Sequence, residues 1–263
     1  MIPTALTDGL NSVPRDRVGS AIFRAARTTG VDFDYLLGQA KIESGLNPNA
    51  KAKTSSATGL FQFIEQTWLG TVKEHGAKHG LGWAADAIRQ GSNGRFYVVG
   101  GMRQTVLDLR KQPEAASAMA AEFASDNKAY LESRLGRAVE PVDLYLAHFL
   151  GAGGAREFLG AHDANPDAPA AGILPAAARA NRWVFYNRDG SPRSFAEIRA
   201  RFADKLGVDD MSVVHPAVAP APAEQPEFPT VQMAALNTAP EPLTRPSPQY
   251  ARLAYLMLAQ LGA

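Results

Sequence analysis

The chain has 263 residues, and its 27 basic side chains (Lys and Arg) nearly balance its 26 acidic ones (Asp and Glu). This balance excludes the strongly basic surface on which proteins that bind nucleic acids or anionic membranes depend. Cysteine is absent, which excludes disulfide bonds, zinc–thiolate centres and thiol nucleophiles. Since no apolar run reaches the roughly 18 residues of a membrane-spanning helix, we also expect no transmembrane segment.

The predicted organisation begins with an N-terminal tail, residues 1–14, followed by one helical domain over residues 15–206. The tail lacks the basic start and continuous apolar core of a secretory signal, so the sequence leaves the export route open. In the domain, apolar residues recur at helical spacing at Val18, Ile22 and Ala26. The sustained alternation that is typical of strands is hard to find, which favours an all-α fold.

The next predicted helix carries the most informative residue, Glu43. It begins at Asp32, a good N-cap residue, and ends at Gly45. Leu36 and Ala40 place Glu43 on the apolar face of this helix, in its last turn. Partial burial there and the negative end of the helix dipole both favour the protonated acid. A carboxylic acid that keeps its proton near neutral pH suits general acid catalysis at a glycosidic bond.

The remainder of the domain is also predicted to be mostly helical. Residues 64–72 keep helical spacing, and residues 114–135 are rich in alanine, a strong helix former. Residues 142–150 are apolar on most sides, as expected of a central buried helix. The last helix of the domain is predicted to end before residue 207, and the glycine-rich stretch 91–101 is expected to be a loop.

Two segments follow the domain. Nine of the 18 prolines lie between positions 215 and 248, so residues 207–248 are predicted to form an extended linker. Residues 249–263 carry leucines and a methionine at helical spacing and are predicted to form a short amphipathic helix. We expect this helix to dock on its own domain or on a partner protein; a frayed tail is the alternative.

His75 and His79 have the i, i+4 spacing of paired metal ligands on a helix. However, no third ligand follows in the sequence, and Gly76 and Gly80 weaken the helix there. The sequence therefore predicts no metal site.

Three motifs together carry a family resemblance. Residues 43–44 read Glu-Ser, residues 59–62 read Gly-Leu-Phe-Gln, and residues 144–153 read Leu-Tyr-Leu-Ala-His-Phe-Leu-Gly-Ala-Gly. At this spacing the chain resembles the lytic transglycosylases of the goose-type-lysozyme-like superfamily, enzymes that cut the glycan strands of bacterial peptidoglycan. The third motif departs from the family pattern, because His148 stands where the family has Tyr and Phe149 where it has Asn.

The resemblance covers roughly residues 15–205 and implies a lysozyme-like helical domain with Glu43 as its catalytic residue. An amide at Gln62 has the donor and acceptor that a sugar N-acetyl group needs, and Gly59 would let the backbone approach a sugar closely. His148 occupies the family's Tyr position, and Tyr145 lies one turn before it. The predicted substrate-binding residues are Ser44, Ser55, Gly59, Gln62, Tyr145 and His148.

The implied reaction needs one carboxyl group and neither a metal nor an organic cofactor. Glu43 would protonate the glycosidic oxygen between N-acetylmuramic acid and N-acetylglucosamine, and would then deprotonate the muramyl C6 hydroxyl. Attack of that hydroxyl on C1 closes a 1,6-anhydro ring, an intramolecular step that competes well with water. The expected partner is peptidoglycan in the periplasm or cell envelope, where cutting would serve local remodelling around an envelope-spanning machine.

Two alternatives stay open from the sequence. A lysozyme-like hydrolase would use a second acid to activate water, for which Glu65, Asp86 and Glu122 are candidates. A non-catalytic wall-binding or assembly module would instead depend on the C-terminal segment.

Overall fold

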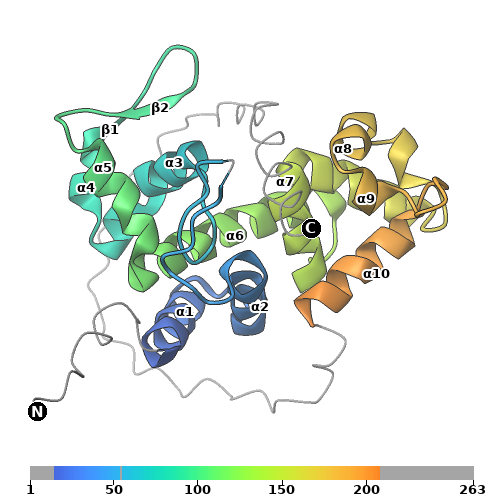
Figure 1. The fold of residues 1–263 in the computed structure, drawn as a ribbon, viewed down its shortest axis with the longest axis horizontal. Coiled ribbons are helices and arrows are strands. Elements are labelled where there is room, and N and C mark those ends of the chain that lie inside the picture. Colours follow the sequence, from blue (N-terminus) through green and yellow to red (C-terminus); the bar gives the residue numbers. More distant parts are fainter. Residues whose placement is uncertain (1–14, 54, 208–263) are drawn as a thin grey trace, which may run out of the picture.

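The computed structural model describes residues 15–53 and 55–207, and helices predominate within them (Figure 1). The all-α prediction is confirmed. The predicted N-terminal tail, the C-terminal helix and all of the linker except its first residue lie outside the described residues. The elements are α1 (Arg15–Thr29), α2 (Phe33–Ser44), α3 (Glu65–His75), the 3₁₀ helix η1 (Gly76–His79), α4 (Gly82–Ala87), β1 (Ile88–Gln90), β2 (Phe96–Val98), α5 (Arg103–Asp108), the 3₁₀ helix η2 (Leu109–Lys111), α6 (Pro113–Leu135), α7 (Pro141–Ala164), the 3₁₀ helix η3 (Ala170–Gly172), α8 (Pro175–Ala180), α9 (Arg182–Phe185) and α10 (Phe195–Leu206).

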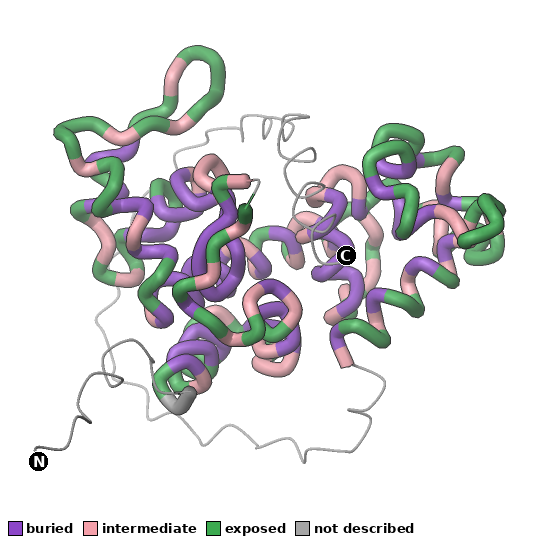
Figure 2. Tube along the Cα trace, viewed as in Figure 1, coloured by how far each residue is buried: buried purple, intermediate pink, exposed green. Residues whose placement is uncertain are grey.

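Helix α6 lies at the centre of the domain and contacts α1, α2, α3 and α7. Its alanine-rich sequence predicted the helix, and the same small side chains let its neighbours pack closely against it. Ala116, Ala120, Ala121 and Ala124 are all buried. In Figure 2 the buried residues concentrate where α1, α3 and α6 face one another. The core thus surrounds α6, with α8, α9 and α10 on the far side of α7 (Figure 1).

Helix α7 is interrupted at Gly151, whose φ of 73° and ψ of 156° are not helical. The predicted helix 142–150 is therefore the first segment of α7, and a second segment continues to Ala164. Asp143 in the first turn is fully buried, and the guanidinium groups of Arg137 and Arg199 lie 2.8 and 3.1 Å from its carboxylate. Because a buried carboxylate needs such partners, this cluster fixes where α7 begins.

Part of the glycine-rich stretch expected as a loop forms a strand instead. Strands β1 and β2 pair antiparallel, with Ile88 opposite Val98, and their turn is closed by a hydrogen bond from Gly91 N to Arg95 O. At three residues each, the strands are too short to show alternation in the sequence. The hairpin projects from the edge of the domain next to α4 and α5 (Figure 1).

Gly59 is held in a backbone conformation and a space that only glycine fits. Its φ is +87°, and a Cβ atom there would lie 1.9 Å from the carbonyl oxygen of Arg110. The close approach that the sequence suggested toward a sugar is therefore made toward the protein's own backbone at η2. Gly94 in the hairpin turn has a similar φ of +74°, but a Cβ atom at that position would meet no other atom within 4 Å. An alanine at Gly94 would therefore meet only the cost of the left-handed backbone conformation, which makes this position a control for Gly59.

We expect Gly59→Ala to destabilise the domain considerably more than Gly94→Ala. The left-handed conformation costs an alanine about 1–2 kcal/mol at either position, but only at Gly59 does the new methyl group overlap backbone. Urea unfolding followed by circular dichroism gives the two free energies of unfolding. Equal losses in the two variants would contradict the close contact between Gly59 and Arg110.

Candidate active site

Glu43 lies in the last turn of α2, as predicted, and the ends of this helix form as the sequence indicated. The Asp32 side chain caps the N-terminus by accepting from Tyr35 N at 2.8 Å, and Gly45 ends the helix with a φ of 61°. Leu36 and Ala40 are fully buried on the same face. The Glu43 side chain is only 2% exposed, so its carboxyl group lies inside the domain rather than in bulk solvent.

His148 on α7 contacts this carboxyl group directly. Its Nε2 atom lies 3.2 Å from Glu43 Oε1, and its Nδ1 atom lies 3.2 Å from Gln39 Nε2. Because an amide nitrogen only donates, Nδ1 is the acceptor and the imidazole proton sits on Nε2, from where it is donated to Glu43. Gln39 and Glu43 are four residues apart on α2, so one helix presents both ends of this hydrogen-bonded chain.

Two tyrosines surround the carboxyl group. The ring of Tyr145 stacks on that of His148, with 5.9 Å between centroids. Burial, and then the negative charge of Glu43, raise the pKa of both Tyr145 and Tyr35, so both phenols stay neutral. The Tyr145 hydroxyl is buried and finds no hydrogen-bond partner among the described residues. Tyr35 was not predicted, although Tyr35, Gln39 and Glu43 form a stripe at a spacing of four on one helix face.

The loop that follows α2 is fixed by the polar residues of the first two motifs. Ser44 Oγ donates to Leu60 O at 2.7 Å and to Ala40 O at 3.1 Å, which ties the end of α2 to this loop. Gln62 has a φ of 46°, and its Nε2 donates to Gly59 O at 2.8 Å and to Ala50 O at 3.2 Å. Both side chains shape the loop, while their contacts with a substrate stay predictions.

Arg110 holds the other side of the same loop. Its buried guanidinium group donates to the carbonyl oxygens of Ser56 at 2.7 Å and Phe63 at 2.9 Å. Ser55, another predicted substrate-binding residue, is half-buried here, and its Oγ accepts from Ala57 N at 3.2 Å. The loop is thus built around an arginine from η2, which the motifs did not reveal.

A cavity of about 310 Å³ is lined by residues of α2, of the loop after it, and of α3, α6 and α7, with His148 in its wall. Among the predicted site residues, Gln62 and His148 line it, whereas Glu43, Ser44, Ser55, Gly59 and Tyr145 are not lining residues. Glu43 lies just behind His148. Polar groups spaced along otherwise apolar walls suit a sugar chain, which offers hydroxyls at its edges and C–H groups on its faces. The full lining is Tyr35, Gln39, Phe61, Gln62, Phe63, Ile64, Gln66, Thr67, Gly70, Thr71, Glu74, Phe96, Ala120, Phe123, Ala124, Asp126, Asn127, Ala147, His148, Gly151 and Ala152.

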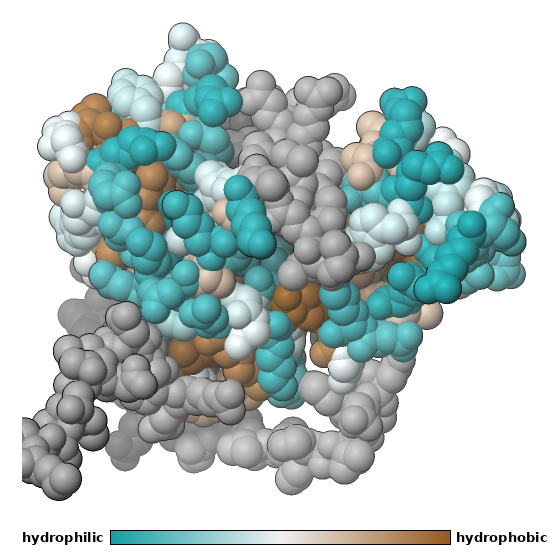
Figure 3. Space-filling view, in the orientation of Figure 1, coloured by the Kyte–Doolittle hydropathy of each residue, from teal (hydrophilic) through white to brown (hydrophobic). Residues whose placement is uncertain are grey.

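The aromatic residues of this region serve mainly the core, as expected. Phe61, Phe63 and Trp68 are buried, Trp68 Nε1 donates to Val106 O at 2.8 Å, and Phe63 packs edge-on against Trp68 with 5.3 Å between ring centroids. Phe61 and Phe63 also form part of the cavity wall. Among the described residues visible in Figure 3, hydrophilic ones predominate, and apolar surface is confined to small areas.

In a comparison with protein families, residues 20–82 match the family model of the transglycosylase SLT domain. The matched segment contains α2 with Glu43, the loop with Gln62, and α3, whereas α6 and α7 lie outside it.

Proposed function

Since the chain contains a transglycosylase SLT domain, and is thus a peptidoglycan lytic transglycosylase of the lysozyme-like superfamily, we propose that Glu43 is its catalytic acid and base. The bond cleaved would be the β-1,4 bond between N-acetylmuramic acid and N-acetylglucosamine, with a 1,6-anhydro-N-acetylmuramic acid product. The observation that carries this proposal is the buried Glu43 carboxyl group in contact with His148, which lines the cavity.

The two carboxyl oxygens of Glu43 would have different roles in the reaction. Oε1 accepts from His148 Nε2, which leaves Oε2 to carry the proton that passes to the glycosidic oxygen. Once that proton has gone, the carboxylate is stabilised by the same imidazole N–H, and Oε2 can take the proton of the muramyl C6 hydroxyl. The bond from C1 to the protonated glycosidic oxygen breaks and releases the N-acetylglucosamine side as an alcohol, while the C6 oxygen bonds to C1 and closes the anhydro ring. Glu43 thereby regains the proton that it gave.

His148 would act as a positioning residue for Glu43. Gln39 holds its ring from one side and Tyr145 stacks on the other, so its N–H direction is fixed.

Two of the other carboxylates that are candidates for a hydrolytic reaction have partners elsewhere. Glu65 is bound by the guanidinium group of Arg103, and Glu122 is bound by His79 at 2.8 Å. Each is thus already engaged by a neighbouring side chain. The third candidate, Asp86, is an exposed residue of α4, and the reaction products distinguish its action as a base from intramolecular attack by the sugar hydroxyl.

The place of action would be the peptidoglycan of the cell envelope or periplasm. In the part of the chain that the structure describes, no helix is both long enough and apolar enough to cross a membrane. A role in wall remodelling around an envelope-spanning machine, with a protein partner for the C-terminal helix, rests on the sequence alone and stays a prediction.

We expect Glu43→Gln to lower turnover of purified peptidoglycan by about 10²- to 10⁴-fold, because the amide cannot donate the proton. Mass spectrometry of the released glycans measures both rate and product, and the wild type should release anhydromuramyl ends. Glu65→Gln, at the ion-paired carboxylate, is the matched control and should keep its activity. Reducing ends as the main wild-type product would support hydrolysis, and an active Glu43→Gln variant would overturn the assignment.

We expect His148→Gln to retain more activity than His148→Leu, because the glutamine amide still offers an N–H to Glu43 and leucine does not. Loss in the leucine variant should be on the order of a hundredfold in kcat. Activity that is kept with glutamine but lost with leucine would separate hydrogen bonding from packing. Equal kcat values in the two variants would show that His148 only fills space.

A further inference from the structure

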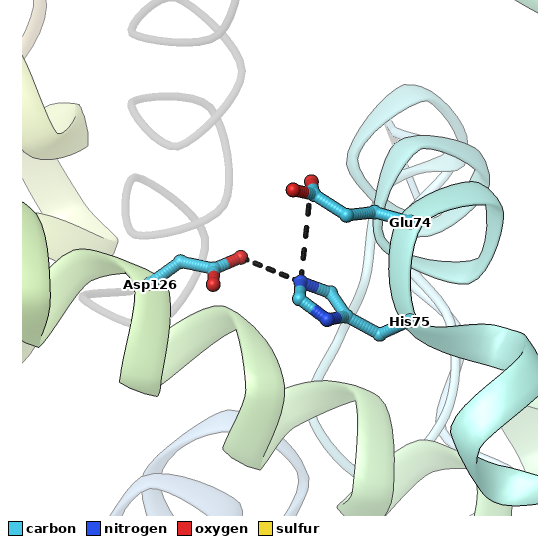
Figure 4. Close-up of side chains that lie close together, drawn as sticks. All are labelled: Glu74, His75 and Asp126. Atoms are coloured by element: carbon cyan, nitrogen blue, oxygen red, sulfur yellow. Dashed lines mark hydrogen bonds and ion pairs between the residues drawn. The ribbon is translucent and has the colours of Figure 1, made fainter. Parts of the chain in front are cut away.

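A second group of potential ligands gathers at the other end of the cavity, between the end of α3 and the facing helix α6. His75 Nε2 lies 2.8 Å from Asp126 Oδ2 and 3.9 Å from Glu74 Oε2, and Figure 4 shows both carboxylates directed at this one nitrogen. One ligand atom of each residue lies within 4.8 Å of the other two. Glu74 and His75 are the last two residues of α3, and the chain continues from Gly76 as the 3₁₀ helix η1.

The far side of the imidazole is also held. Its Nδ1 atom lies 3.1 Å from Glu122 Oε2, and the other oxygen of Glu122 is bound by His79 Nε2 at 2.8 Å. The Glu122 carboxylate can accept a hydrogen bond from Nδ1, which leaves Nε2 for a metal. A carboxylate behind a histidine is the usual support of a metal-binding imidazole.

The separations suit a small divalent ion. Bonds of about 2.0–2.2 Å from zinc to nitrogen and oxygen place tetrahedral ligand atoms about 3.3–3.6 Å apart. The present distances from His75 Nε2, 2.8 and 3.9 Å, lie on either side of that value. Asp126 would move out and Glu74 would move in, each by less than an ångström. Both carboxylates are accessible, at 47% and 71% exposure of their side chains, so such shifts are easy.

We propose that Glu74, His75 and Asp126 bind a zinc ion, with Glu122 orienting the imidazole. The imidazole nitrogen favours zinc over magnesium or calcium, which prefer oxygen ligands. Three protein ligands leave a fourth position open, and since Glu74 and Asp126 line the cavity, that position faces the space where a glycan would lie. The proposal departs from the expectation from sequence, because the third ligand comes from α6 rather than from the residues after His79.

The competing explanation is an ion-pair cluster that only joins α3 to α6. Such a cluster has no need of Glu74, which is mostly exposed and 3.9 Å from the imidazole. The Lys78 ammonium distinguishes the two explanations as well. It lies 3.6 Å from Glu122 Oε2 and 3.3 Å from His75 Nδ1, so its charge would stabilise an ion-pair cluster but would oppose a bound cation.

The test is zinc titration of the purified full-length chain by calorimetry, with cobalt(II) absorption as a report on the ligands. We expect one ion per chain, and at least a tenfold loss of affinity in Glu74→Gln and in Asp126→Asn. Lys78→Met should bind zinc more tightly, because a nearby positive charge is removed. His162→Asn is the matched control: the His162 ring lies 3.3 Å from Asp163 in a separate exposed pair, and its loss should leave binding unchanged.

The exposed positions of Glu74 and Asp126 mean that these variants should fold, which thermal melting checks. Absence of zinc binding by the wild type at millimolar concentration would overturn the proposal. Binding that survives both Glu74→Gln and Asp126→Asn, or that disappears in His162→Asn, would overturn it equally. The readout is metal binding alone, so the result is independent of whether Glu43 is the catalytic residue.

Discussion

The contact between Glu43 and His148 depends on a fixed separation between two helices that are distant in the sequence. Glu43 is on α2 and His148 is on α7, and 3.2 Å joins Oε1 to Nε2. If α2 and α7 moved apart by one ångström, this hydrogen bond would break unless the Glu43 and His148 side chains moved to follow, and that movement would cost free energy. The rest of the domain can be understood as the means of holding these two helices in place.

Helix α6 sets the separation from one side and α10 from the other, because both contact α2 and α7. The ring of Phe202 on α10 packs against Tyr145 and Phe149 on α7, with centroids 5.4 and 5.0 Å apart. On α2, a Cβ atom at Gly38 would lie 3.1 Å from the carbonyl oxygen of Leu206, so a larger residue would push α10 away. The small residues on α2 and α6 thus permit short interhelical distances, and the aromatic residues on α7 and α10 fill the space that remains.

Features determined by neighbouring residues could be predicted from the sequence, whereas their distant partners could not. The cap at Asp32 and the burial of Glu43 follow from capping and amphipathic spacing, which act within a few residues. That Gln39 holds His148 depends on a contact between helices, which no local pattern encodes. For the same reason the spacing of the histidines at positions 75 and 79 reveals no third ligand. Their carboxylate partners are an i, i+4 pair on the facing helix α6, at positions 122 and 126.

The two ends of the cavity use an imidazole in the same way. At each end one ring nitrogen is held by a neighbouring side chain, and the other is directed at a carboxylate: Glu43 for His148, and Asp126 for His75. The difference lies in the group behind the ring. The neutral amide of residue 39 donates to His148, which keeps the proton on the nitrogen that faces Glu43. The Glu122 carboxylate can only accept, so in the proposed zinc site His75 would hold its proton on the far nitrogen and offer a lone pair from the near one. The same ring is thus a hydrogen-bond donor at one end and a potential metal ligand at the other, according to the charge of the residue behind it.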